Sequence, residues 1–129
     1  MATTQAPIYQ TVPDKDYFSL SSKGNIDYGA VVKRLSFEKK DVSTATGVPL
    51  ASIRYDDKIP QEVRERITEW ATLLNLVAQH FQGDLNKTIM WFTMPNPLLG
   101  NISPRDMIRF GRYKKLLNFI LNAAGENTR

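Results

Sequence analysis

The residues that decide the fold are IPQEVRERITEWATLLNLVAQHFQG, positions 59–83. Apolar side chains recur every three or four positions through this stretch, which is the spacing of one face of an α-helix. Pro60 lies near the start of the pattern and Gly83 at its end, and these residue types favour the beginning and the end of a helix. The apolar positions are Val63, Ile67, Trp70, Ala71, Leu74, Val77, Ala78 and Phe81. We expect one helix of about six turns at the centre of the core.

The chain before this helix divides into a tail and a first short helix. Residues 1–26 mix Thr, Gln, Pro, Ser, Asp and Lys without a sustained period, and we interpret them as a flexible N-terminal tail. Residues 28–35 place apolar side chains on one helical face, and Asp27 is suited to capping that helix.

The next segment, residues 36–58, has features of a helix-turn-helix. Ser36 is placed to cap a helix over residues 38–46, and Gly47 supplies the left-handed residue that ends it. Pro49 is suited to opening a second helix, through Ile53 and Tyr55. Ser43, Gly47, Val48 and Ile53 meet the spacing of small, turn and buried residues that such a motif needs.

If this motif binds DNA, five residues are the candidates. The second helix would present Ser52, Arg54 and Tyr55 to a groove, with Lys39 and Lys40 near the phosphate backbone. The adjacent Asp56 and Asp57 oppose this reading, because they bring negative charge towards the phosphates.

After the long helix, the pattern predicts three more helices and one irregular loop. A short helix is expected over residues 84–92, followed by a loop over residues 93–103 that Pro95 and Pro97 keep irregular. Ser103 and the proline after it restart a helix that Gly111 ends, and residues 112–125 form the last helix. The sequence therefore predicts an all-α fold. We divide it into the tail (1–26), the helix-turn-helix (27–59), and the long helix with the C-terminal helices (60–129).

Composition excludes several classes of function. The 129 residues include no cysteine, so disulfides, thiol nucleophiles and cysteine-bound zinc are excluded. The chain has a single histidine, His80. Asp56 and Asp57 are adjacent, so their side chains would diverge on a helix and could not act as a paired acid and base. No Gly-rich phosphate loop is present. We expect neither an enzyme nor a metal or cofactor site. No apolar run approaches the ~18 residues of a membrane span and no secretory signal begins the chain, so we expect a cytoplasmic protein.

The positive charge of the chain is concentrated at one end. Residues 1–100 carry eleven basic and eleven acidic side chains, whereas the last 29 residues carry six basic and two acidic ones. Such an excess could meet phosphate or an acidic protein surface, or it could be a solvated helix face.

A run of special residues after the long helix gives the chain a family resemblance. In order, the run consists of Trp91, Asn96-Pro97, Leu99-Gly100, Ser103-Pro104 and Gly111, and then Leu116-Leu117 and Ile120-Leu121. With the long helix before it, this run resembles the Xre/MbcA/ParS-like antitoxin family, in which an Xre-type helix-turn-helix precedes a C-terminal toxin-binding domain. The resemblance covers residues 27–124.

The resemblance implies an antitoxin of a type II toxin–antitoxin pair. Its partner would be a RES-type toxin that consumes NAD⁺, or a related ADP-ribosylating toxin, whose active site the C-terminal segment covers. A homodimeric antitoxin that represses its own operon is also implied. The candidate toxin contacts are Trp91, Asn96, Leu99, Arg105, Arg109, Arg112, Lys115 and Arg129. Of these, we expect Arg105, Arg109, Arg112 and Lys115 to be solvated and to be the better candidates for contact with a partner. Two alternatives are a stand-alone helix-turn-helix transcriptional regulator that dimerises through its C-terminal helices, and an adaptor that binds protein alone.

Overall fold

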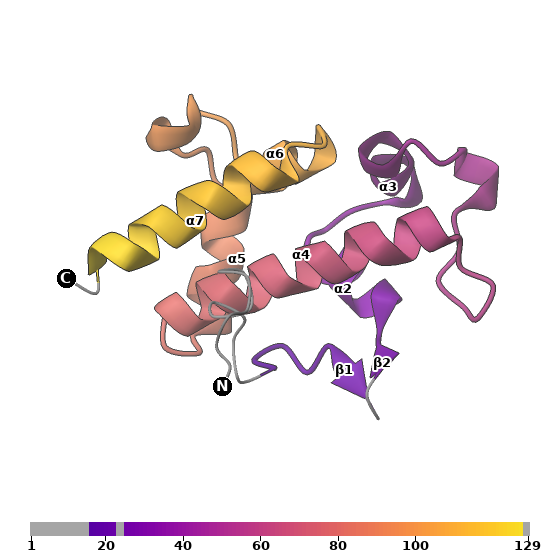
Figure 1. Ribbon diagram of the computed structural model, residues 1–129, viewed down its shortest axis with the longest axis horizontal. Coiled ribbons are helices and arrows are strands. Elements are labelled where there is room, and N and C mark those ends of the chain that lie inside the picture. Colours follow the sequence, from indigo (N-terminus) through magenta and orange to yellow (C-terminus); the bar gives the residue numbers. More distant parts are fainter. Residues whose placement is uncertain (1–15, 23–24, 128–129) are drawn as a thin grey trace, which may run out of the picture.

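The computed structural model describes residues 16–22 and 25–127, and most of them are helical (Figure 1). The elements in chain order are β1 (Ser21–Ser22), β2 (Asn25–Ile26), α2 (Tyr28–Arg34), α3 (Lys39–Thr46), the 3₁₀ turn η1 (Leu50–Ser52), α4 (Gln61–His80), α5 (Leu85–Thr93), the 3₁₀ turn η2 (Pro97–Leu99), α6 (Pro104–Arg109) and α7 (Tyr113–Asn127). Within the described ranges, strand is confined to the antiparallel pair β1–β2. The fold is all-α, as the sequence predicts.

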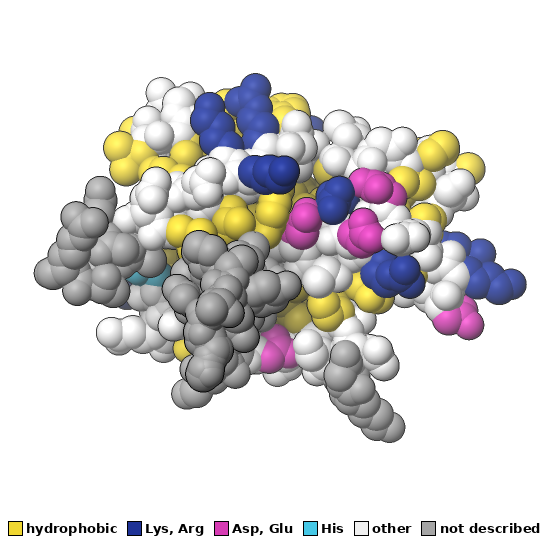
Figure 2. Space-filling model, viewed as in Figure 1, with side chains coloured by type: hydrophobic (Ala, Val, Ile, Leu, Met, Phe, Trp, Pro, Cys, Tyr) yellow, Lys and Arg dark blue, Asp and Glu magenta, His cyan; other side chains and the backbone are white. Residues whose placement is uncertain are grey.

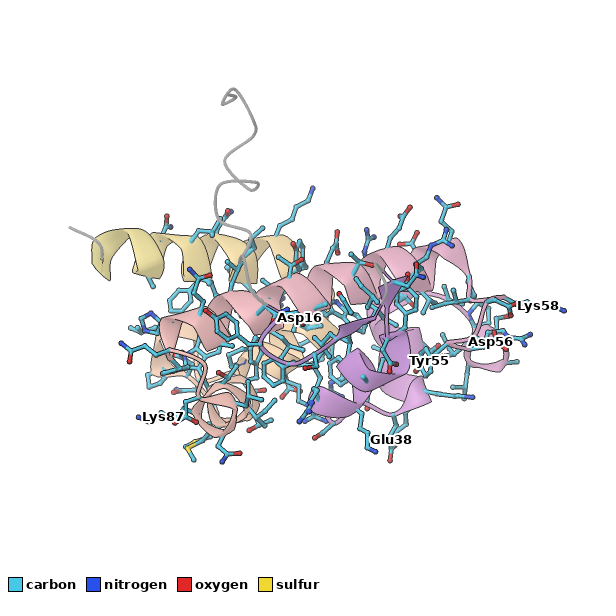
Figure 3. The ribbon with its side chains drawn as sticks, turned by 90° about the horizontal axis from the view of Figure 1, so that it is seen from below. Asp16, Glu38, Tyr55, Asp56, Lys58 and Lys87 are labelled. Atoms are coloured by element: carbon cyan, nitrogen blue, oxygen red, sulfur yellow. The ribbon has the colours of Figure 1, made fainter. Side chains whose placement is uncertain are left out.

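Helix α4 is the central element of the core. It follows Pro60, and Gly83 just beyond it has a φ of +86°, so both ends match the prediction. Helices α2, α3, α5 and α7 all pack against it, and α7 runs alongside it in two views (Figures 1 and 3). Its buried side chains are Val63, Ile67, Trp70, Ala71, Leu73, Leu74, Val77 and Ala78. The predicted central helix is confirmed.

The interpretation of residues 1–26 as a flexible tail is wrong for residues 16–22 and 25–26. Phe18 and Leu20 are buried in the core, and the backbone N–H of Tyr17 donates to Oδ1 of Asn75 on α4 at 2.9 Å. Residues 16–22 and 25–26, which include β1 and β2, lie along one side of α4 (Figure 1). The segment is too short to show a hydrophobic period, so its packing is decided by α4 and α2 rather than by its own pattern. Residues 1–15 lie outside the described part of the chain.

The caps of the first two helices differ in how well they were predicted. Oδ1 of Asp27 accepts from the backbone N–H of Ala30 at 3.1 Å and caps α2, as expected. Ser36, in contrast, has a φ of +57° and does not cap α3. The cap is Glu38, whose backbone N–H donates to Oδ2 of Asp41 at 2.8 Å. Glu38 and Asp41 each satisfy the other's backbone donor, so the cap lies two residues later than predicted and the helix begins at Lys39, one residue later.

The second helix of the expected helix-turn-helix is only the three-residue turn η1. The turn before it forms as predicted, because Gly47 has a φ of +79° and the hydroxyl of Ser43 donates to the carbonyl of Val48 at 2.7 Å. None of the side chains of η1 is buried, and Ile53 beyond it is extended. A short helix without a buried face gains too little packing energy to offset the cost of ordering its backbone, so the prediction of a helix through Ile53 and Tyr55 is wrong.

Candidate protein-binding site

The loop between α5 and α6 is held closed by its own hydrogen bonds. Oδ1 of Asn96 accepts from the backbone N–H of Leu98 at 2.9 Å, and the backbone N–H of Asn96 donates to the carbonyl of Ile102 at 3.2 Å. Gly100 completes η2 with a φ of +78°, a conformation that costs glycine little. Hydroxyl Oγ of Ser103 accepts from the backbone N–H of Asp106 at 3.1 Å and caps α6, as predicted. The loop therefore presents a fixed surface.

Replacing Ser103 by alanine is expected to lower the free energy of unfolding by about 1 kcal/mol, because α6 loses its N-cap. The backbone N–H of Asp106 then loses its acceptor. Urea unfolding followed by circular dichroism measures this change. The control is Ser52→Ala in η1, since Ser52 is exposed and makes no capping bond. Equal effects of the two substitutions would show that the cap contributes nothing.

Three large apolar side chains on this side of the molecule face solvent. Met90 and Met94 on α5 are 57% and 54% exposed, and Leu98 in η2 is 79% exposed. The methionines are four residues apart, so they share one face of the helix, whereas Thr88 and Phe92 of the same helix are buried. Side chains of this size in one place are a typical feature of an interaction surface.

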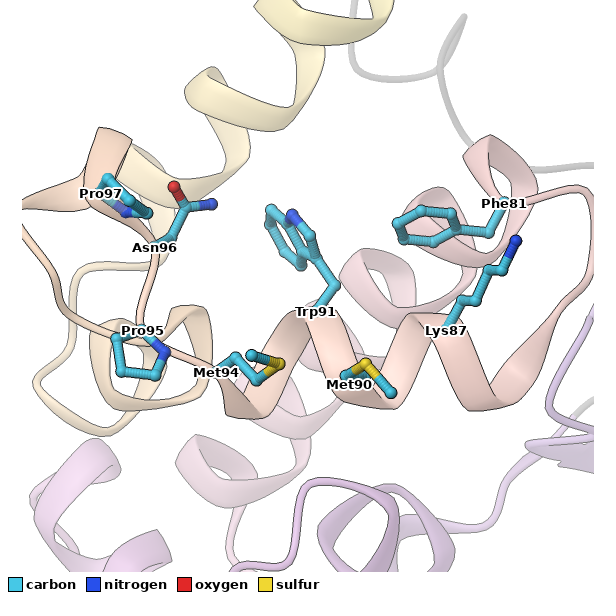
Figure 4. A pocket seen from close by; sticks show the side chains of 8 residues that line it. All are labelled: Phe81, Lys87, Met90, Trp91, Met94, Pro95, Asn96 and Pro97. Carbon is cyan, nitrogen blue, oxygen red and sulfur yellow. The ribbon is translucent and has the colours of Figure 1, made fainter.

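Beside these residues lies a groove of about 370 Å³ (Figure 4). Its lining residues are Phe81, Lys87, Met90, Trp91, Met94, Pro95, Asn96 and Pro97. The indole of Trp91 stands between Phe81 and Asn96 in the close-up view. It is half-buried, and its ring packs edge-on against Phe92 with centroids 5.1 Å apart. Because Phe92 is fully buried, the indole is anchored to the core.

Only part of the predicted toxin-contact set lies at this surface. Trp91 and Asn96 line the groove, while Leu99 is half-buried against the core. Arg112, just before α7, and Lys115, in its first turn, are exposed as expected, but neither lines the groove. Arg129 lies outside the described residues.

Arg105 and Arg109 are half-buried and engaged within the molecule, so the expectation that they are solvated is wrong, while their role as toxin contacts stays a prediction. Arg105 donates from Nη2 to the carbonyl of Ser36 at 3.0 Å, and its guanidinium lies 5.4 Å from the ring centroid of Phe37. Arg109 lies 3.0 Å from a carboxylate oxygen of Asp106 and 3.9 Å from one of Asp41. Arg105 therefore joins α6 to the loop before α3, and Arg109 joins α6 to α3 itself.

Sequence reasoning missed Met90, Met94 and Leu98. The spacing of the two methionines, on the side of α5 away from Phe92, is a signal that could have indicated an exposed apolar face. Leu98 gives no such signal, because its exposure depends on how the loop closes.

Lys87 is the only charged residue that lines the groove, and the exposed Asp84 lies three residues before it, at the N-terminus of α5. Between residues 85 and 123 the only carboxylate belongs to Asp106, which pairs with Arg109, whereas Lys87, Arg112, Lys114 and Lys115 are exposed. On the face of the molecule that Figure 2 shows, dark-blue side chains lie beside hydrophobic atoms at the upper left, and magenta carboxylates lie further along the molecule. On α4, carboxylate oxygens of Glu62 and Glu69 lie 2.9 and 2.8 Å from the guanidinium of Arg66, and burial raises the pKa of Glu69.

The predicted DNA-contact residues are not gathered into an open cationic surface. Arg54 donates from Nε to Oδ1 of Asp56 at 2.7 Å, and this guanidinium holds the pKa of Asp56 below its ordinary value. Lys40 lies 3.4 Å from a carboxylate oxygen of Glu38. Lys39 and Ser52 are exposed.

Tyr55, the fifth predicted DNA contact, points inward. Its hydroxyl is buried without a hydrogen-bond partner among the described residues, and burial raises its pKa. Asp56 and Lys58 lie at the opposite end of the molecule from Lys87 (Figure 3).

The part of the chain that the structure describes holds no group of three His, Cys, Asp or Glu side chains placed to bind a metal. No helix in these ranges has the length and apolar character needed to cross a bilayer. Comparison of the chain with protein-family models, with curated proteins and with solved structures finds no match in any of the three.

Proposed function

We propose that this protein is a non-enzymatic antitoxin that binds and neutralises a RES-type NAD⁺-consuming toxin, or a related ADP-ribosylating toxin. The observation that carries the proposal is the groove where the exposed Met90 and Met94 lie beside the half-buried Trp91, with the exposed Leu98 in the loop that follows. This surface lies within and beside the run of residues that resembles the toxin-binding domain of the Xre/MbcA/ParS-like family.

The order of the loop supports a role in tight binding. A segment that is already closed by Asn96 and by the Ser103 cap loses little conformational entropy when a partner binds. Trp91 offers a large, anchored aromatic ring, and tryptophan is enriched among the residues that dominate interface energies. The exposed Arg112 and Lys115 would contact the partner beyond the apolar surface. Repression of the operon by a dimeric antitoxin or by the complex belongs to the same proposal.

The alternative, a stand-alone DNA-binding regulator, has weaker support in the geometry. A recognition helix normally presents several side chains along one face to the major groove, and η1 spans three residues. Arg54, one of the three side chains predicted to face a groove, is engaged by Asp56. Steep salt dependence of operator binding by the chain alone would favour this alternative.

Co-expression with the product of the neighbouring gene tests the proposal, because toxin and antitoxin of such pairs are encoded together. We expect that product to stop growth and deplete NAD⁺, and this chain to restore both. The carboxylate of Leu98→Glu would be buried against the partner, so this variant should bind at least tenfold more weakly. Thr44→Glu on α3 adds the same charge at an exposed position away from the groove and should bind normally.

Point variants are preferable to a truncation after residue 90. Phe92, Met107 and Leu116 are buried in the shared core, so such a truncation would remove part of the fold. A neighbouring product that is not toxic, or toxicity that this chain does not relieve, would contradict the antitoxin proposal.

A further inference from the structure

We infer that the chain's own N-terminal segment, residues 8–12, occupies the groove beside Trp91 in the free protein and leaves it when a partner binds there. Apolar side chains that line a groove gain free energy when another apolar group removes them from water. The inference goes beyond the proposed function, because it concerns the free protein and holds for any partner of the groove.

The described part of the chain begins beside one end of the groove. Phe81 and Lys87 stand at that end in Figure 4. The turn between α4 and α5 joins these two residues, and Gly83 lies within it. A Cβ atom on Gly83 would be 3.5 Å from two ring carbons of Tyr17, so the second described residue packs against this turn. Residues 1–15 are therefore joined to the fold beside this end of the groove.

Residues 8–12 are near enough to Asp16 in the chain to extend along the groove. Oδ1 of Asp16 accepts from Nδ2 of Asn75 on α4 at 3.3 Å. Phe81 comes six residues after Asn75, which is about 9 Å along the helix axis. An extended chain covers about 3.3–3.6 Å per residue, so the chain from Asp16 back to Val12 spans up to about 14 Å and reaches the near end. Residues 8–12 span a similar length again, which exceeds the roughly 10 Å of α5 that lines the groove.

The segment matches the groove in polarity. Residues 2–13 include no charged side chain, and their large apolar members are Ile8, Tyr9 and Val12. The groove wall consists mostly of methionines, prolines and aromatic rings, and Lys87 is its only charged residue. Methionine side chains adjust their shape to different apolar partners, which suits a wall that receives a peptide segment.

Two further arguments favour the chain's own segment over a separate molecule. Phe18 and Leu20 are buried in the core although residues 16–22 form no helix, so apolar residues of this region pack onto the fold without a regular element of their own. A segment tethered near its site has an effective concentration of about 1 mM, so it fills even a weak site. A partner must displace the segment, and its apparent affinity falls with the fraction of protein in which the groove is filled.

Paramagnetic broadening in nuclear magnetic resonance tests the inference on the intact chain. The sequence has no cysteine, so Gln10→Cys gives a single site for a nitroxide label within the segment. We expect the label to broaden the indole N–H signal of Trp91 strongly, and reduction of the nitroxide to restore it. The backbone amide of Lys58, at the opposite end of the molecule from Lys87 (Figure 3), should keep its intensity.

Two substitutions in the labelled segment form a matched pair. Ile8→Asp should restore most of the Trp91 signal, because its carboxylate would be buried among apolar side chains. Thr3→Asp adds the same charge to the N-terminal region outside residues 8–12 and should leave the broadening unchanged. Met94→Glu changes the groove wall instead and should also restore the signal. Met94 is 54% exposed, so this variant should keep its fold, which circular dichroism checks.

Three results would overturn the inference. One is a Trp91 signal that is broadened no more than that of Lys58. Another is broadening that Ile8→Asp and Met94→Glu leave unchanged, which would mean that the label is near the groove but the segment does not bind in it. The last is equal broadening when labelled chains without ¹⁵N are mixed with unlabelled chains that carry ¹⁵N, which would place the segment in the groove of a second copy. The experiment contains no toxin, so its failure leaves the growth assay unaffected, and a failed growth assay leaves this result intact.

Discussion

Trp70→Ala is expected to lower the free energy of unfolding by about 3–5 kcal/mol, among the largest losses that a core substitution causes. Trp70 is 1% exposed and is one of the largest fully buried side chains. Its ring packs edge-on against Phe37, with centroids 5.5 Å apart, and so joins α4 to the segment before α3. Alanine would remove that contact and leave a cavity where these elements meet. Because a domain of this size is stable by only about 5–15 kcal/mol, the variant should be studied at low temperature.

Trp91→Ala is the matched control, since it removes the same side chain from a half-buried position. Urea unfolding followed by far-ultraviolet circular dichroism compares the two variants without relying on tryptophan fluorescence. We expect Trp91→Ala to lose much less stability, because part of its ring stays in water in the folded protein. Equal losses would contradict the assignment of Trp70 to the core and Trp91 to the surface.

The helices with a sustained period were predictable from the sequence. Residues 59–83 repeat an apolar side chain over many turns, and Pro60 and Gly83 mark the two ends, so local pattern and tertiary packing agree. The same holds for α6, where Ser103 and Gly111 mark the boundaries. In each case the information lies within a few residues of the feature that it determines.

The second half of the helix-turn-helix shows what a residue pattern cannot decide. Ser43 and Gly47 form the expected turn, but η1 stops after three residues because none of its side chains is buried. Whether a short segment continues as a helix depends on the surface available to cover it. That surface is a property of the whole fold.

The residues proposed for the candidate site also differ in how far the sequence could predict their positions. Trp91 and Asn96 could be chosen from the sequence, because both stand in the run of special residues that follows the long helix, and both line the groove. Arg105 and Arg109 could not be placed, because a sequence shows a charge without showing its partner. In the folded protein their partners come from residues 36–41, nearly seventy positions earlier in the chain. The positive excess of the C-terminal part is therefore smaller at the surface than a count of residues suggests.

Leu20→Ala is expected to lower the free energy of unfolding by about 2–5 kcal/mol, although Leu20 lies in a segment with no recognisable secondary-structure pattern. Its side chain is 1% exposed, and its carbonyl accepts from the backbone N–H of Asp27 at 2.6 Å. The substitution keeps this backbone bond and removes only the buried methyl groups. The measured loss therefore reports how firmly the segment before α2 is packed onto the core.

Ser21→Ala is the control for Leu20→Ala, because Ser21 is the next residue and is exposed. We expect it to change the free energy of unfolding by less than about 0.5 kcal/mol. The slope of unfolding free energy against urea concentration should be the same for both variants and the unsubstituted protein. The reason is that neither substitution changes much of the surface that unfolding exposes. A small loss for both variants would mean that residues 16–22 do not form part of the stable core. In that case Phe18 would have to be exposed as well, and the side of α4 near β1 and β2 would be open to solvent.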